Sequence, residues 1–235
     1  MPIKLKLALL TLMMSLAISV RAQSMFTNSY SQTVNTIVPD DNPNGINSTI
    51  TVSGAQGAIQ SVSIGMTVTN GFAGDYYAYV VDPAGDLAVL ANRVGVGSGN
   101  PFGYSETGFN VTFSSLATNN IHFYQLGSYT VDGNGVLLGT WQADGRNIDP
   151  ESTPSAFNTA STTTGLNLFP GTNPNGDWTF FIADMSGGYQ GTLVDWNITV
   201  VSTPEPASVQ LLAVAAAIGA GYGLRRHLGG KRFVQ

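Results

Sequence analysis

The stretch Val-Asp-Trp-Asn-Ile-Thr-Val at residues 194–200 alternates apolar and polar side chains without a break. Successive side chains of a β-strand point to opposite faces, so this order gives a strand one apolar row and one polar row. Residues 61–69 and 178–183 alternate in the same way. All three segments are typical of strands in antiparallel sheets with one buried face and one solvated face.

Turn sequences divide the rest of residues 23–203 into short segments, and none of these shows helical periodicity. Asn-Pro-Asn-Gly stands at 42–45 and again at 173–176, and Asp-Pro-Ala-Gly stands at 82–85. Proline presets φ, and Asn-Gly tolerates the positive φ of a tight reversal. Further strands are expected in five segments: Ser48–Val52, Tyr76–Val81, Leu87–Ala91, Phe109–Phe113 and Ile121–Tyr124.

These patterns predict an all-β single domain over residues 23–203, a β-sandwich or jelly roll with Trp178 and Trp196 in its core. Residues 95–108 are expected to form a glycine-rich loop. Residues 141–170 are long for an unstructured connection, so we expect a strand around Gly165–Phe169.

The composition limits the chemistry and the partners. The 235 residues include no cysteine, which excludes disulfides and thiolate metal sites. Residues 23–203 contain thirteen carboxylates against two basic residues, Arg93 and Arg146, a formal charge of −11. The other seven basic residues lie in the two terminal segments. A domain without a basic patch is not expected to bind nucleic acid.

The first 22 residues have the order of a secretory signal peptide. Lys4 and Lys6 precede an apolar run at residues 7–20, and Ala22 supplies a small residue for cleavage before Gln23. The alternative is a membrane anchor, but 14 apolar residues make a helix of only about 21 Å. We expect export by the Sec machinery and cleavage by signal peptidase between Ala22 and Gln23.

Residues 204–235 have a different order. Pro204-Glu205-Pro206 lies shortly before an apolar stretch at 209–224, and residues 207–224 would be about 27 Å long as a helix. A basic tail follows, with Arg225, Arg226, Lys231 and Arg232. Such a tail stays in the cytoplasm by the positive-inside rule, which leaves the domain outside.

This C-terminal order resembles the PEP-CTERM sorting signal. The resemblance implies a Gram-negative bacterium that makes exopolysaccharide, transient residence in the inner membrane through a transmembrane sorting helix, and processing by an exosortase. The alternative is a permanent tail anchor.

Residues 23–203 resemble the P domain (P/Homo B), a jelly roll that follows the catalytic domain of proprotein convertases. The similar parts are the opening turn at 40–45, the Gly74-Asp75 pair before residues 76–81, the turn at 82–85, the loop at 92–95, and the ending motifs at 175–178, 182–184, 191–193 and 196–200. Phe72 stands where many members carry His, and Tyr189 where they often have Asp.

Catalytic motifs are not evident in the domain. His122 is the one histidine that remains after processing, and its setting in residues 121–124 is typical of a half-exposed structural histidine in a strand. There is no Gly-x-Ser-x-Gly sequence, and the glycines at 95–99 are not followed by a helix that would bind phosphate. We therefore expect a protein that is not an enzyme.

Calcium is the one cofactor with a physical case. Asp75, Asp82 and Asp184 stand at predicted strand ends, where loop carboxylates supply calcium ligands and where P domains can carry calcium. The alternative is that these residues cap turns through their side chains. Two roles are open for the five tyrosines at 76, 77, 79, 104 and 124. They form a platform on which sugar rings stack, or they are ordinary residues of the core and the sheet faces.

Together these features predict an exported, non-catalytic protein of the cell surface or extracellular matrix, with a structural or binding role in exopolysaccharide or biofilm. The alternative function is a carbohydrate-active hydrolase that uses a pair of Asp carboxylates.

Overall fold

The computed structural model describes residues 24–203, which form one compact unit. The predicted signal peptide with its cleavage site at Ala22 and Gln23, and the predicted sorting segment 204–235, lie outside the described residues. Within the part that is described, no helix combines the length and the apolar character needed to cross a membrane.

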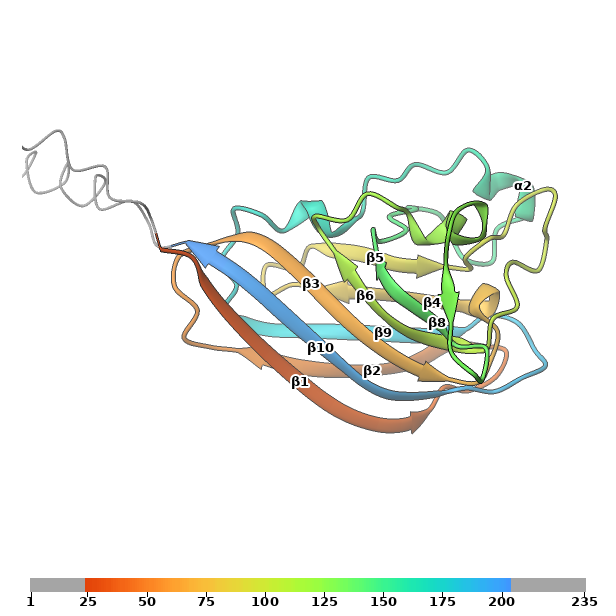
Figure 1. Ribbon diagram of the computed structural model, residues 1–235, viewed down its shortest axis with the longest axis horizontal. Coiled ribbons are helices and arrows are strands. Elements are labelled where there is room, and N and C mark those ends of the chain that lie inside the picture. The colour runs from red at the N-terminus through yellow and green to blue at the C-terminus, as the bar shows by residue number, and fades with distance from the viewer. Residues whose placement is uncertain (1–23, 204–235) are drawn as a thin grey trace, which may run out of the picture. The chain divides into compact units, whose positions relative to one another are not determined.

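Two β-sheets form the unit (Figure 1). The six-stranded sheet has the order β1 (Phe26–Ile37), β10 (Thr192–Thr203), β3 (Ala58–Thr69), β6 (Gly108–Ser114), β8 (Leu137–Trp141) and β7 (Thr130–Val131). The four-stranded sheet has the order β2 (Asn42–Val52), β9 (Gly176–Asp184), β4 (Tyr76–Val81) and β5 (Leu87–Asn92). All pairings are antiparallel except that of β6 with β8.

Both sheets turn an apolar row toward a common core. In β3 the inward residues are Val62, Ile64, Met66 and Val68, each at most 1% exposed. The expectation that Trp178 and Trp196 are core residues is confirmed, because both side chains are fully buried. Trp196 stacks on Phe180 of the opposite sheet at 5.4 Å between ring centroids, so the aromatic rings join the two layers.

Each buried tryptophan also satisfies its indole N–H. The Trp178 nitrogen donates to the carbonyl of Pro174 at 2.9 Å, and the Trp196 nitrogen donates to the Ser48 hydroxyl at 2.9 Å. Burial of an unpaired indole N–H would cost free energy, and these two bonds remove that cost. The first bond ties the second Asn-Pro-Asn-Gly turn to the core.

The predicted strands are confirmed with four differences. Residues 121–124 are not a strand: they lie in the 3-10 helix η2 (Ile121–Leu126), because the Asn120 side chain accepts a hydrogen bond from the His122 N–H and caps a helical turn. The strand expected around Gly165–Phe169 is the 3-10 helix η3 (Leu166–Leu168). Strands β1, β7 and β8 were not predicted.

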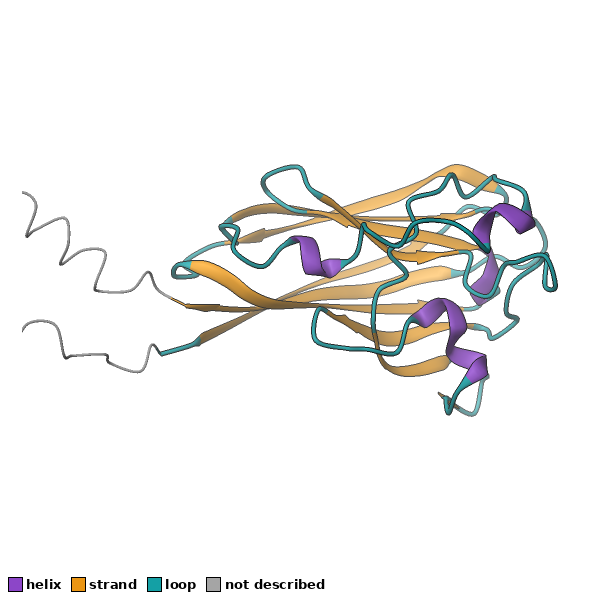
Figure 2. Cartoon of the chain, turned by 90° about the horizontal axis from the view of Figure 1, so that it is seen from above, coloured by secondary structure: helices purple, strands orange, loops and turns teal. Residues whose placement is uncertain are grey.

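The fourth difference concerns the C-terminal strand. Val194 does not belong to the buried row, which is continued by Leu193 instead. The register of β10 against β3 shifts between Leu193 and Asp195, and such a bulge adds one residue and reverses the facing of the side chains beyond it. The remaining helices are short, namely η1 (Ala73–Asp75) and α2 (Pro154–Phe157) (Figure 2).

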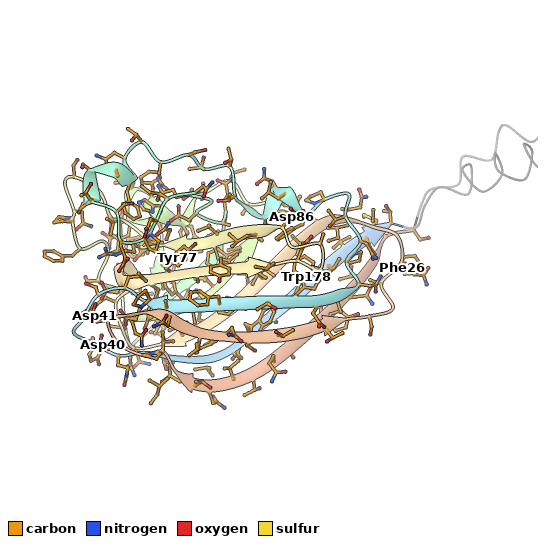
Figure 3. The ribbon with its side chains drawn as sticks, turned by 180° about the vertical axis from the view of Figure 1, so that it is seen from behind. Phe26, Asp40, Asp41, Tyr77, Asp86 and Trp178 are labelled. Carbon is orange, nitrogen blue, oxygen red and sulfur yellow. The ribbon has the colours of Figure 1, made fainter. Side chains whose placement is uncertain are left out.

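The two ends of the domain leave from the same end of the six-stranded sheet. Phe26 of β1 pairs with Ser202 of β10, whereas Ile37 and Thr192 pair at the other end of the same two strands. The turn at Asp40 and Asp41 follows β1 and therefore lies at the end remote from Phe26 (Figure 3).

We predict that Trp178→Ala or Trp196→Ala lowers the free energy of unfolding by about 3–5 kcal/mol, because each change leaves a large cavity between the sheets. Urea denaturation followed by tyrosine and far-ultraviolet signals measures the change. Leu126→Ala is the control, since Leu126 is 81% exposed and its loss should change stability by less than about 0.5 kcal/mol. A loss below about 1 kcal/mol for both tryptophans would contradict the core assignment.

Candidate site at the acidic end

Three aspartates gather at the end of the four-stranded sheet remote from the chain ends. We call Asp40, Asp75 and Asp184 the acidic end. Asp75 immediately precedes β4, and Asp184 is the last residue of β9. In the β4–β9 register Tyr76 faces Asp184, and the Met185 N–H donates to the Asp75 carbonyl at 2.8 Å. Antiparallel pairing thus brings together two residues that lie far apart in the sequence.

The loops around this end are fixed by main-chain contacts. The Asp40 carboxylate accepts from the Gly188 N–H at 3.1 Å, which ties the turn after β1 to the loop after β9. The Gly74 N–H donates to the Tyr104 carbonyl at 2.8 Å. A Cβ at position 74 would lie 2.4 Å from the Phe102 carbonyl oxygen, so glycine is required before Asp75.

The carboxyl groups of Asp75 and Asp184 are buried, and their hydrogen bonds do not fully replace the water that they lose. The Asp184 side chain is 0% exposed, its Oδ1 accepts from the Ser186 N–H at 3.2 Å, and its Oδ2 has no hydrogen-bond partner. Asp75 is 6% exposed. A buried, unpaired carboxylate oxygen is costly, so this end of the sheet favours either a proton or a bound cation.

The electrostatics agree with this interpretation. Burial first, and then the negative charge of Asp184, raise the pKa of Asp75 from 3.8 to about 7, although the charge of Arg93 opposes the shift. Burial also raises the pKa of Asp184 to about 6, while the Ser186 N–H acts in the opposite direction. Both carboxyl groups therefore change charge between weakly acidic and neutral pH.

Two of the three residues predicted to bind calcium lie together, and the third does not. Asp82 follows the last residue of β4, so it is about 23 Å along the chain from Asp75 at about 3.3 Å per residue. Its Oδ1 accepts from the N–H groups of Ala84 and Asp86 at 2.9 Å, which is the turn-capping role given above as the alternative.

The donor set at the acidic end suits a hard cation only in part. Asp75 and Asp184 supply carboxylate oxygens, the ligand type that calcium prefers. Among residues 24–203, however, no three Asp, Glu or His side chains form a metal-binding group. Main-chain carbonyl and water oxygens would have to complete the coordination shell of a calcium ion held there.

Phe72 and Tyr189, the two residues that differ from the P-domain pattern, are in contact with each other. The rings of Phe72 and Tyr189 lie 5.6 Å apart, beside the acidic end, and both are partly exposed. The Phe72 carbonyl accepts from the Asp75 N–H at 3.0 Å. An aromatic pair therefore occupies the two positions where many P domains carry His and Asp.

His122 is buried, not half-exposed as its sequence setting predicted. Its Nδ1 lies 2.8 Å from Asp144 Oδ2, and its Nε2 lies 3.0 Å from the Val96 carbonyl oxygen. Arg146 donates to the other Asp144 oxygen at 2.7 Å. Both ring nitrogens are engaged inside the protein, so His122 has no free nitrogen with which to accept a proton from a nucleophile.

The sequence did not identify Asp40 or Phe181 as site residues, and Phe181 packs against two of the five tyrosines. Tyr76 and Tyr124 are core residues, and Tyr104 packs edge-on against Tyr124. Tyr77 and Tyr79 instead lie on the outer face of the four-stranded sheet, in contact with Phe181. The Asp40-Asp41 pair before the first Asn-Pro-Asn-Gly was the available signal for Asp40.

We predict that, without calcium, the free energy of unfolding falls as the pH rises from about 4 to about 7. The pKa of Asp75 in the folded state lies above that of an unfolded aspartate, so the folded state holds more protons in this window. Asp75→Asn, which keeps the size and removes the charge, should therefore be more stabilising at pH 8 than at pH 4.

Thermal unfolding in a chelating buffer across this pH range measures the effect. Leu126→Ala, an exposed apolar position without a titrating group, is the control, and its effect on stability should be the same across this pH range. An Asp75→Asn difference that is constant with pH would show that the Asp75 carboxyl group does not titrate in this window.

No protein-family profile and no curated protein sequence matches the chain. Among solved structures, the serine protease of Aeromonas sobria is similar, with 15% identity and a TM-score of 0.44 in the complex with its chaperone, and 14% and 0.43 alone. The alignments cover 81% and 80% of this chain and 29% of each protease chain. The chain thus spans less than a third of these proteins, and the similarity is too low to carry an argument about activity.

Proposed function

We propose that this chain is an exported, non-catalytic component of the cell surface or extracellular matrix, cut near both ends of one β domain, which binds exopolysaccharide. The observation that carries the proposal is the pair of terminal signals around residues 23–203. The strands support it, because β1 begins at Phe26 and β10 ends at Thr203, close to both predicted processing points. The acidic end lies at the strand ends remote from Phe26 and Ser202.

The finer family assignment is part of this proposal: a P-domain-like jelly roll, followed by a PEP-CTERM sorting segment with a transmembrane helix. Its motifs coincide with defined parts of the fold. Residues 82–85 form the turn between β4 and β5, where the Gly85 N–H donates to the Asp82 carbonyl at 3.0 Å. The ending motifs run from β9 through the following loop into β10.

The proposed cofactor is calcium, held by Asp75 and Asp184. The support is the unpartnered Oδ2 of Asp184 and the absence of full charge compensation, since Arg93 directs hydrogen bonds to the carbonyls of Gly74 and Pro150. A cation in contact with both carboxylates would relieve their desolvation and their mutual repulsion. The ion would then be structural, joining β4 to β9 and the loops that follow them.

The raised pKa values also favour a second candidate, a hydrolase in which one of these two carboxyl groups acts as a general acid. A catalytic acid has to contact the glycosidic oxygen of its substrate. Asp184 is fully buried and Asp75 nearly so, which argues for ion binding over hydrolysis.

We predict that millimolar calcium raises the melting temperature, and more so at pH 8 than at pH 5, because the ion binds only the deprotonated carboxylates of the folded state. Asp75→Ala and Asp184→Ala should each abolish the gain. Asp82→Asn should keep it, because Asp82 lies at the other end of β4. No shift at millimolar calcium would remove calcium from the proposal.

We also predict that the protein purified from an exporting host binds the producer's own polysaccharide saturably and does not cleave it. Reducing-end assays over a day measure turnover. A separate measurement, the intact mass, should give Gln23 as the first residue and a C-terminus near Pro204-Glu205-Pro206. Turnover that is lost in a folded Asp75→Asn or Asp184→Asn variant would establish the hydrolase instead. Mature protein that still ends at Gln235 in a strain with active exosortase would contradict the sorting assignment.

A further inference from the structure

Three aromatic rings form a continuous strip on the outer face of the four-stranded sheet. Phe181 of β9 stacks on Tyr79 of β4 at 4.7 Å with 16° between the ring planes. Tyr77, two residues before Tyr79 on the same face, lies 5.6 Å from Tyr79 and 6.4 Å from Phe181. All three side chains are partly exposed, whereas the alternate residues Ala78 and Val80 are buried in the core. Figure 3 shows Tyr77 on this face.

Two different borders flank this aromatic strip. On the β5 side, residues 144–164 cover the sheet edge through hydrogen bonds from the Gly145 N–H to Val89 and from the Val89 N–H to Thr164. On the β2 side the strip meets a row of neutral polar groups. Asn47 pairs with Phe181, and the hydroxyls of Thr49 and Thr179 lie 3.2 Å apart in the next cross-strand pair on the same face.

The charges near the strip select the class of ligand. The nearby acidic groups are Asp177 on β9 and Asp149. The pKa of the Tyr77 hydroxyl is raised, first by burial, then by Tyr79 and then by the negative charge of Asp149. Among residues 24–203 the only basic side chains are Arg146, which is buried, and Arg93, which donates to main-chain carbonyls. A phosphate or carboxylate ligand would meet no counter-charge here, and single-stranded nucleic acid would lack the basic groove it requires.

A second copy of the chain is a poor occupant. A fully buried aromatic side chain contributes about 150–250 Å², and well over half of the surface of each of these three residues is already covered. They therefore offer far less than the roughly 800 Å² per partner of a stable protein interface. The rim of threonine and asparagine is suited to hydroxyl groups.

We propose that Tyr77, Tyr79 and Phe181 form a stacking platform for an extended, neutral glycan chain. The C–H face of a pyranose ring packs against the electron-rich face of an aromatic ring, and the hydroxyls at its rim bond to neutral polar groups such as Thr179 and Asn47. This inference rests on the proposed function as a polysaccharide-binding protein and does not depend on calcium, because the strip lies on the sheet face and the acidic end lies at the strand ends.

The test measures affinity of the exported, purified protein for neutral hexasaccharides (cellohexaose, mannohexaose, and the neutral fraction of the producer's polysaccharide) by calorimetry at fixed calcium. Tyr79→Ala and Phe181→Ala should each weaken binding about tenfold, since each removes one stacking face. Tyr79→Phe keeps the face and should retain affinity within about twofold. Tyr129→Ala, an exposed aromatic elsewhere, is the control and should bind as the unchanged protein does.

Melting temperatures of all variants identify any that fail to fold, and in that case Tyr77→Ala, at the edge of the strip, replaces the affected variant. Equal binding by the unchanged protein and the alanine variants would overturn the platform and leave the proposed function intact. Equal affinity for an anionic mannuronate hexamer would overturn the charge argument and with it the neutral ligand. No binding to any neutral glycan, including the producer's own, would overturn the platform, and cleavage of that glycan would overturn the proposed function.

Discussion

The register of β4 against β9 is the constraint on which the other features depend. Tyr76 faces Asp184 and Tyr79 faces Phe181, and side chains alternate along both strands. One pairing therefore decides three things at once: Trp178 and Phe180 point into the core, Phe181 joins Tyr77 and Tyr79 outside, and Asp75 meets Asp184 at the strand ends. A slip by one residue would exchange the core row and the outer row.

Two unlike surfaces result from this pairing. The acidic end stores electrostatic strain, because two carboxyl groups are buried near one another and one oxygen has no donor. The aromatic strip is neutral and preorganised, since its rings already contact one another and have few rotamers to lose on binding. The acidic end suits an ion that stabilises the fold. The aromatic strip suits a ligand that binds to the surface without changing the fold.

The irregular segments are held by buried polar groups instead of by regular pairing. Asp144 accepts from Arg146, from the Asn92 N–H and from the His122 ring, so one carboxylate joins η2, β5 and the segment after β8. A buried charge of this kind is tolerated only when its oxygens are satisfied, as they are here. This network explains why a long segment rich in small polar residues can pack against a sheet edge without strands of its own.

The sequence by itself determined the all-β class, most strands and the burial of both tryptophans, because period-two alternation and turn residues are local signals. It did not reveal β1, whose Ser, Thr and Asn residues show no apolar row, or the helical turn at His122, where an asparagine cap outweighed an apolar run. Only the tertiary structure decided that Asp75 lies beside Asp184, whereas Asp82 lies at the other end of β4. It also decided that Tyr77 and Tyr79 face outward with Phe181, while Tyr76 is buried in the core. Those choices depend on cross-strand register, which joins residues about a hundred positions apart and leaves no mark in either segment alone.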